Sequence, residues 1–253
     1  MVKVGIIGGS GMDDPGIVDD ATRVTVKTDY GEPSSLLTLG KIGGVDVVIL
    51  ARHGKGHTIT PSGVNNRANI MALKEQGVTD ILATTACGSL KQEIGRGDFV
   101  VLDQFIDFTR LRKNTFYQSF EKGMVHAPMA DPFDERLRQI LFDTAVAQNA
   151  RVHPRGTVVT IEGPRFSTRA ESRMFQMLGG DVINMSIAPE AALAREASIP
   201  YGAVAMATDY DCWNEEEVPV SWEEVMKVFN NNAERVKSLL IAAVMALKDS
   251  SIQ

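Results

Sequence analysis

Five apolar runs of this chain end abruptly in clusters of glycine, hydroxyl, acidic or basic residues. The runs and the polar residues that follow them are 2–7 with 8–11, 47–50 with 52–54, 81–83 with 84–89, 182–183 with 184–186, and 202–207 with 208–211. Short, continuous apolar runs are typical of strands that are buried on both faces of a parallel sheet. In open α/β folds ligands bind beyond the carboxyl ends of such strands, so we expect the five polar clusters to form one site.

The segments between these runs have helical periodicity. We expect helices from Pro61 to the stop signal at Gly77, over 134–149, over 168–178, over about 189–197 and from a capping box at Ser221 and Glu224 onward, with further strands over 78–83 and 157–161. Alternating strands and helices predict an α/β fold, a twisted, mostly parallel central sheet flanked by helices. The 253 residues are enough for a single domain over 1–253. The longest irregular segment, 106–132, contains aromatic residues and His126, and loops of this length are often functional.

Composition excludes several classes of protein. A net charge of −6 provides no basic field for a nucleic-acid backbone, so we expect no nucleic-acid partner. The apolar run 239–247 is about half of the ~20 residues that a membrane span needs, and the N-terminus begins directly with a strand, so neither a membrane partner nor a secretory signal is expected. Two cysteines, Cys87 and Cys212, cannot form a disulfide framework, which favours a cytoplasmic protein.

The first polar clusters indicate an anion site. Glycines in 8–11 allow backbone N–H groups to approach a negative charge, although such loops are also common as plain turns. The pattern is neither G-x-G-x-x-G nor a P-loop, so it does not indicate a nicotinamide cofactor or ATP. Arg52 and His53 add donors suited to phosphate, and Thr85 and Ser186 add hydroxyls from two other strand ends. Taken singly, Arg52 fits a surface ion pair, His53 a structural histidine and the hydroxyls helix caps.

Asp209 and Asp211 follow the most apolar of the runs. Carboxylates are costly to bury there unless they accept hydrogen bonds or hold a proton. We discount a metal because the four histidines have no ligand spacing and no other carboxylates join the pair. An Asx turn is one interpretation. The other is that Asp209 donates a proton to a leaving heterocycle while Asp211 orients the ring.

Six motifs, in the same order and spacing, resemble those of the methylthioadenosine phosphorylases, in the trimeric branch of the purine nucleoside phosphorylase superfamily. They are residues 6–11, 51–54, 84–90, 160–167, 184–186 and 207–211. The resemblance covers essentially the whole chain, from Val4 to about Leu240.

The resemblance implies roles for individual residues. Phosphate would bind at Ser10, Arg52, His53, Thr85, Ala86 and Ser186. The substrate would contact Met185 under the ribose, Phe166 and Ser167 near the purine, Asp209 and Asp211 on its edge, His57, Val225 and Trp222 around the 5′ group, and His126 from a neighbouring subunit. Asp209 would be the catalytic acid that protonates purine N7. Relatives that prefer 6-oxopurines have Asn at this position, so an aspartate here favours a 6-aminopurine as the base.

The implied reaction is phosphate-dependent cleavage of the N-glycosidic bond of methylthioadenosine, with inorganic phosphate as co-substrate and no metal or organic cofactor. A homotrimer, or a dimer of trimers, is implied. Trp222 departs from the small aliphatic residue of mammalian members, which leaves methylthioinosine, adenosine, inosine and guanosine open as substrates. A nucleosidase that uses water, a non-catalytic nucleoside-binding protein and, more weakly, a dehydrogenase are the alternatives.

Overall fold

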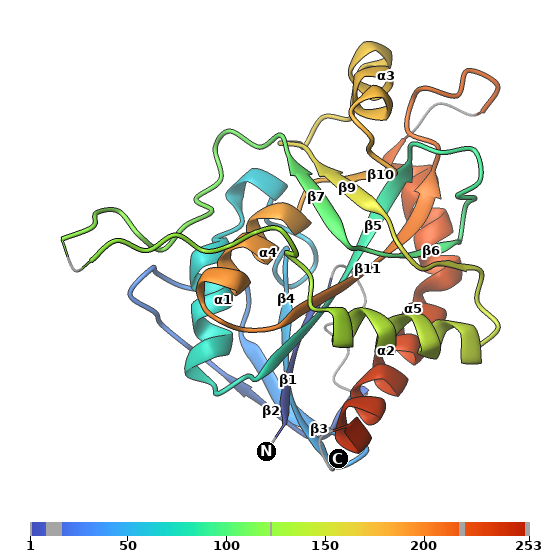
Figure 1. The fold of residues 1–253 in the computed structure, drawn as a ribbon. Helices are drawn as coiled ribbons and strands as arrows, with labels where there is room; N and C mark the ends of the chain where they lie inside the picture. Colours follow the sequence, from blue (N-terminus) through green and yellow to red (C-terminus); the bar gives the residue numbers. More distant parts are fainter. Residues whose placement is uncertain (1, 9–16, 122, 218–220, 251–253) are drawn as a thin grey trace.

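The computed structural model describes residues 2–8, 17–121, 123–217 and 221–250 (Figure 1). The strands are β1 (Lys3–Gly8), β2 (Asp19–Val24), β3 (Leu37–Ile42), β4 (Val45–Ala51), β5 (Asp80–Ser89), β6 (Phe99–Val101), β7 (Gln104–Asp107), β8 (Val152–His153), β9 (Thr157–Thr160), β10 (Val182–Asn184) and β11 (Tyr201–Asp209). The helices are α1 (Asn66–Glu75), α2 (Glu135–Ala147), α3 (Arg169–Met177), α4 (Ile187–Glu196) and α5 (Trp222–Ser250), and Pro61–Gly63 forms a short 3₁₀ turn.

β5 is the centre of one mixed sheet whose strands run β2-β3-β4-β1-β5-β10-β9-β7, with β11, β6 and β8 branching from β5. Along one edge β5 pairs with β11 from Ile81 to Gly88. Along the other edge it pairs in parallel with β1 up to Ala83, and antiparallel with β10 only from Gly88 onward. Between these pairings, residues 84–87 pair with β11 alone among the described strands. On this edge of β5 the sheet therefore has a gap between β1 and β10, beside the middle of the strand.

Helices cover both faces of the sheet, and the alternation of side chains along the strands divides the core between them. On β4, Val48 and Leu50 join the cluster with α1 and α4, whereas Val47 and Ile49 join the cluster with α2 and α5. Because both sets are buried, the strand reads as a continuous apolar run, as strands covered on both faces do. The predicted α/β class is confirmed, and six of the ten pairings among the described strands are parallel.

Hydrogen-bonding side chains begin several helices where the sequence predicts. Asp134 caps α2 by accepting from Leu137 N–H, and Thr168 and Glu171 form a capping box at α3. Ser221 Oγ accepts from Glu224 N–H at the start of α5.

The helix expected from Pro61 begins later than predicted, because Pro61–Gly63 closes a 3₁₀ turn and Asn65 then caps α1. It ends before Gly77, which has a φ of +75°. The predicted stop signal therefore holds although the start is displaced.

Two predicted boundaries are wrong. The polar residues 84–89 do not follow the third strand but belong to it, because β5 continues to Ser89 through its pairing with β11. Residues 106–107 complete β7 rather than beginning a loop. The irregular segment that follows, 108–134, extends away from the body of the molecule (Figure 1). In the described part of the chain, no helix has the length and apolar character needed to cross a membrane.

Candidate active site

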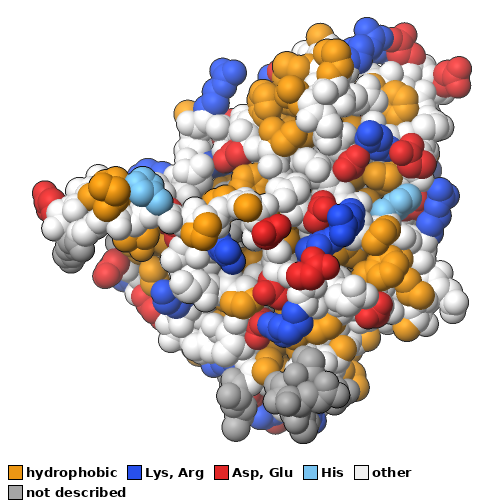
Figure 2. Space-filling model, viewed as in Figure 1, with side chains coloured by type: hydrophobic (Ala, Val, Ile, Leu, Met, Phe, Trp, Pro, Cys, Tyr) orange, Lys and Arg blue, Asp and Glu red, His pale blue; other side chains and the backbone are white. Residues whose placement is uncertain are grey.

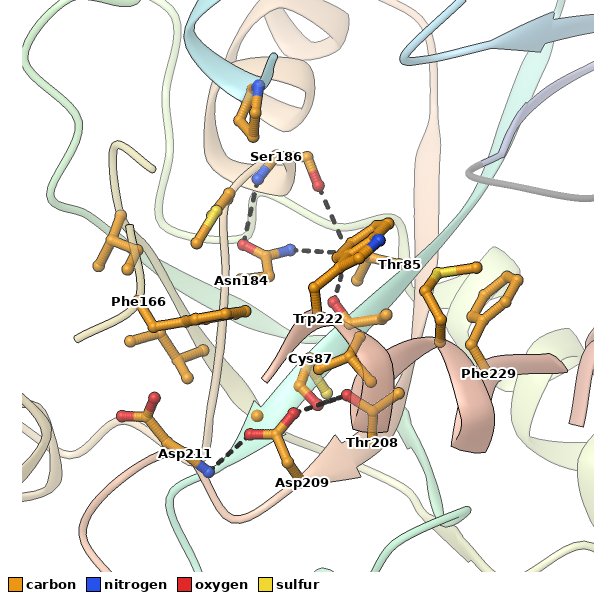
Figure 3. Close-up of a pocket in the computed structure, with 18 of the residues that line it drawn as sticks. Thr85, Cys87, Phe166, Asn184, Ser186, Thr208, Asp209, Asp211, Trp222 and Phe229 are labelled. Atoms are coloured by element: carbon orange, nitrogen blue, oxygen red, sulfur yellow. Dashed lines mark hydrogen bonds between the residues drawn. The ribbon is translucent and has the colours of Figure 1, made fainter. Parts of the chain in front are cut away.

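A cavity of about 980 Å³, including space open to solvent, lies where the sheet parts (Figure 3). It is lined by Arg52, His53, His57, Pro61, 84–88, Ile161, Phe166, Ser167, 183–186, Thr208, Asp209, Asp211, Trp222, Val225, Met226 and Phe229. The middle of β5 is exposed to the cavity because β1 and β10 pair with opposite ends of that strand. Polar residues of four predicted strand ends therefore lie together, around the second half of β5.

One end of the cavity contains a buried carboxyl group, that of Asp209. The pairing of β11 with β5 shifts register between Ala207 and Asp209, a bulge of the kind that redirects side chains beside active sites. Asp209 Oδ1 accepts from Asp211 N–H at 2.7 Å, and Thr208 Oγ1 lies 2.7 Å from Oδ2. A Cβ on Gly88 would come within 2.9 Å of Oδ1, so glycine there leaves room for the carboxyl group.

Burial raises the pKa of Asp209 to about 6, although hydrogen bonds from Thr208 and Asp211 partly offset the increase. Thr208 accommodates both protonation states. Its hydroxyl donates to the ionised carboxylate, and when Asp209 carries the proton on Oδ2 the hydroxyl accepts it and donates instead to Cys87 O, 3.1 Å away. Asp209 can therefore release or hold a proton near neutral pH without leaving a buried group unpaired.

Asp211 is held in an unusual backbone conformation, with a φ of +49°. This conformation directs its N–H toward Asp209, while its own buried carboxyl group faces the hydroxyls of Ser167 and Ser172. Burial raises the pKa of Asp211, and the two hydroxyls partly counter the increase. Neither hydroxyl has a hydrogen bond of normal geometry within the described residues. Ser167 lines the cavity beside Asp211.

Arg52 lies beside Thr84, four residues along β5 from the Gly88 that faces Asp209, so it is at the other end of the cavity from the carboxyl groups; its side chain is only 2% exposed. Its Nη2 donates to Glu190 at 3.0 Å, its Nε donates to the other oxygen of the same carboxylate, and its Nη1 donates to Thr84 O at 2.8 Å. Tyr201 O–H donates to Glu190 at 2.8 Å. A guanidinium has five N–H groups, so two remain for a ligand. The alternative interpretation of Arg52 taken singly, a surface ion pair, does not hold, because the pair with Glu190 is buried.

His53 is an acceptor toward the cavity. Its Nδ1 lies 2.9 Å from Ile59 O, and because a carbonyl only accepts, Nδ1 carries the hydrogen. Burial, followed by the charge of Arg52, lowers the pKa of His53 to about 4, so the ring is neutral near pH 7. Nε2 then has a lone pair and no hydrogen. A ligand that binds Nε2 must present an O–H or N–H group.

Hydroxyl and amide groups complete this end of the cavity. Thr85 Oγ1 lies 3.4 Å from Ser186 Oγ and accepts from Asn184 Nδ2 at 3.2 Å (Figure 3). Ser186 occupies the N-cap position of α4, but its side chain does not cap the helix. The Ser186 hydroxyl therefore remains directed to the cavity rather than to the helix, beside the positive end of the helix dipole.

A third, apolar part of the cavity is formed by the start of α5. Trp222 lies over the cavity (Figure 3). Its ring is 5.3 Å from that of His57, which in turn stacks on His53 at 4.3 Å. Val225, Met226 and Phe229 follow on the same helix. Trp222 is 49% exposed, so this wall borders the solvent.

Of the predicted site residues that the structure describes, all line the cavity except His126. Ser10 lies outside the described residues. His126 is exposed in the loop 108–134, where its ring contacts that of Phe120 at 5.4 Å, and it does not line the cavity of its own chain.

The sequence analysis did not identify several residues that support or complete the lining of the cavity. Glu190, which is fully buried under Arg52, had one visible signal, a lone acidic residue in the apolar segment 187–194. Thr208 belongs to a predicted polar cluster, but nothing in the sequence indicates its hydrogen bond to Asp209. Met226 and Phe229 follow from helical spacing, since they lie four and seven residues after Trp222. Within the described residues, no three His, Cys, Asp or Glu side chains are grouped as a metal would require.

Comparison with known proteins identifies the family. The family model of the phosphorylase superfamily matches residues 3–245. The chain belongs to the phosphorylase superfamily. Within this superfamily it is 53% identical to an S-methyl-5'-thioadenosine phosphorylase of Danio rerio and 51% to one of Anopheles gambiae, each over 96% of this chain and 88% of the relative.

Solved structures of this superfamily have the same fold. A methylthioadenosine phosphorylase from Schistosoma mansoni in complex with adenine superposes with a TM-score of 0.93 at 46% identity, covering 98% of this chain and 93% of that one. A point mutant of the adenosine/methylthioadenosine phosphorylase from the same organism, in complex with methylthioadenosine, gives a TM-score of 0.92 at 45% identity, covering 98% and 92%.

The buried ion pair predicts the effect of Glu190→Gln. This change leaves the Arg52 guanidinium buried without a countercharge, so we expect the free energy of unfolding in urea to fall by about 3–5 kcal/mol. The matched control is Asp46→Asn, which removes the acid of the exposed Lys41–Asp46 pair and should change stability far less. Equal losses in the two variants would show that the burial of the pair has no energetic consequence.

Proposed function

We propose that the protein catalyses the phosphorolysis of S-methyl-5'-thioadenosine to adenine and 5-methylthioribose 1-phosphate. The observation that carries this proposal is the arrangement of the cavity, which has a carboxyl group with a raised pKa at one end and anion donors at the other. The similarity to methylthioadenosine phosphorylases supports the choice of substrate. Inorganic phosphate is the co-substrate, and the reaction needs no cofactor.

Phosphate would bind to Arg52, His53, Thr85, Ala86 and Ser186, with Ser10 as a further donor. Because Glu190 neutralises Arg52 and His53 is neutral, the site binds phosphate chiefly through directed hydrogen bonds rather than net charge. His53 Nε2 accepts, so a phosphate O–H group would point to His53, and the ionised oxygens would face the hydroxyls and the guanidinium. This orientation leaves an ionised oxygen for attack on the sugar.

In the reaction a phosphate oxygen forms a bond to C1′ as the bond from C1′ to N9 breaks. The sugar passes through a state with oxocarbenium character, and the electron pair of the broken bond moves onto the purine. Asp209 donates its proton to N7, so adenine leaves as a neutral molecule. Met185 would support the ribose and Phe166 the purine, which fixes the distance between nucleophile and leaving group.

Base specificity would depend on Asp211, which accepts from the 6-amino group, with Ser167 as a second polar contact to the ring. His57, Val225 and Trp222 would contact the methylthio group. An apolar pocket discriminates a small substituent by only about 1–3 kcal/mol, so adenosine, which differs at the 5′ position, is a competing substrate of the same site.

We also propose that the protein is a cytoplasmic homotrimer that functions in purine and methionine salvage. The loop 108–134 exposes apolar side chains, which gather where it projects from the body (Figure 2). Contact with a neighbouring subunit would bury them and bring His126 to that subunit's cavity.

Sedimentation equilibrium tests the assembly. Because each subunit would complete its neighbour's cavity, we expect a mass of three times the 27.5 kDa of one chain, or six times for paired trimers. A monomer at micromolar concentration would contradict the assembly.

A substrate panel with and without phosphate tests the activity. We expect methylthioadenosine to be cleaved only when phosphate is added, with adenine and a sugar 1-phosphate as products, and faster than methylthioinosine, inosine or guanosine. Equal cleavage in phosphate-free buffer would identify a nucleosidase that uses water. Binding without turnover under either condition would identify a nucleoside-binding protein.

Asp209→Asn is the matched variant for this panel. The amide keeps the size of the side chain but has no proton of suitable acidity, so we expect kcat/KM for methylthioadenosine to fall by about 10²–10⁴. Since an amide can donate to a 6-oxo group, the ratio of methylthioinosine to methylthioadenosine cleavage should rise. An unchanged rate and ratio would mean that Asp209 neither donates the proton nor selects the base.

A further inference from the structure

Arg112 is a buried cation outside the cavity, and it connects three acceptors. Although it lies in the loop 108–134, its side chain is only 1% exposed. Its Nε donates to Glu162 Oε1 at 2.8 Å, its Nη2 to Glu162 O at 2.5 Å, and its Nη1 to Met185 O at 3.0 Å. A planar guanidinium holds such a set of acceptors in one geometry, which a lysine ammonium cannot do.

Glu162 is held as firmly as Arg112. Its Oε2 accepts from Arg110 N–H at 2.7 Å and Leu111 N–H at 3.0 Å, and its Oε1 accepts from Ser62 Oγ at 2.9 Å. Although partial burial raises it, these hydrogen bonds hold the pKa of Glu162 at about 2, so the carboxylate is charged at neutral pH. Glu162 therefore anchors the start of the projecting loop to the segment that precedes Phe166.

The third acceptor of Arg112 belongs to the cavity. Met185 lines it, and Ser186, the next residue, supplies a hydroxyl to its anion end. A Cβ on Gly163 would come within 2.4 Å of Met185 Sδ, so the segment after Glu162 also packs directly on this side chain. The position of the 185–186 turn is thus determined from outside the cavity, by Arg112 on its carbonyl and by Gly163 on its side chain.

We propose that Arg112 is a positioning residue for the reaction: by holding the Met185 carbonyl it sets the 185–186 turn against the sugar and phosphate. Because the Arg112 backbone belongs to the loop 108–134, the same contact links the loop to the sugar end of the cavity. The inference rests on the proposed function. It assigns no role to Arg112 at the purine, where Asp209 and Asp211 belong to a different strand end.

The test compares Arg112→Met with Arg173→Met. Arg173 is the matched control, since it also pairs with a glutamate, Glu215, but is 59% exposed and does not line the cavity. In Arg112→Met we expect kcat/KM for methylthioadenosine to fall about 10- to 100-fold and KM for phosphate to rise, because displacing reacting groups by a fraction of an ångström has effects of this size. The Kd for adenine should stay within about twofold of wild type. Arg173→Met should resemble wild type in all three.

Arg112→Lys keeps the charge and tests the geometry if the methionine variant does not fold. It should show the same changes in kcat/KM and in KM for phosphate, but smaller ones, because an ammonium cannot reach all three oxygens. Wild-type kinetics in Arg112→Lys, or an adenine Kd that weakens as much as the nucleoside parameters, would overturn the inference. A wild-type protein without phosphate-dependent turnover would overturn the proposed function itself, which separates the two failures.

Discussion

The desolvation of one carboxyl group, that of Asp209, is the interaction on which the site depends. It arises from the topology: β11 pairs with β5 along most of its length, whereas β1 and β10 each pair with one end of β5. The cavity opens between them, and the bulge at 207–209 turns the carboxyl group into its wall. Buried there, Asp209 retains a proton far above the ordinary range of an aspartic acid, because its pKa is raised to about 6. The pairing of the strands is thus the origin of the raised pKa of Asp209.

The opposite end of the cavity must bind an anion without burying an unpaired cation. A phosphate requires donors, yet an unpaired buried cation would destabilise the fold. The Arg52–Glu190 pair, with Tyr201 on the same carboxylate, keeps the guanidinium rigid and leaves two N–H groups for the ligand. His53 contributes no charge, because burial lowers its pKa. The anion end therefore consists of directed, nearly neutral groups, and selectivity for phosphate would arise from geometry.

The sequence predicts most of the fold because local signals and burial agree. The Asp134 and Thr168 caps and the Gly77 stop are visible in it, and so are the apolar runs of strands covered on both faces. The polarity of residues 84–89 is typical of a loop, yet they form part of a strand, because its pairing depends on the backbone and not on apolar side chains. Lining residues at strand ends were predictable. The roles of Glu190 and Arg112 were not, because they depend on contacts between segments distant in the chain.

The most direct measurement is the number of protons taken up when methylthioadenosine binds in phosphate-free buffer, obtained by calorimetry in buffers of different ionisation enthalpy. With a pKa of about 6, Asp209 is largely ionised in the unliganded protein at a pH of about 7.5. N7 of the intact nucleoside carries only a lone pair, so Asp209 must be protonated to donate to it; wild type will then take up roughly one proton per site and Asp209→Asn almost none. Methylthioadenosine binding with no proton uptake, or with equal uptake in both proteins, would contradict the account.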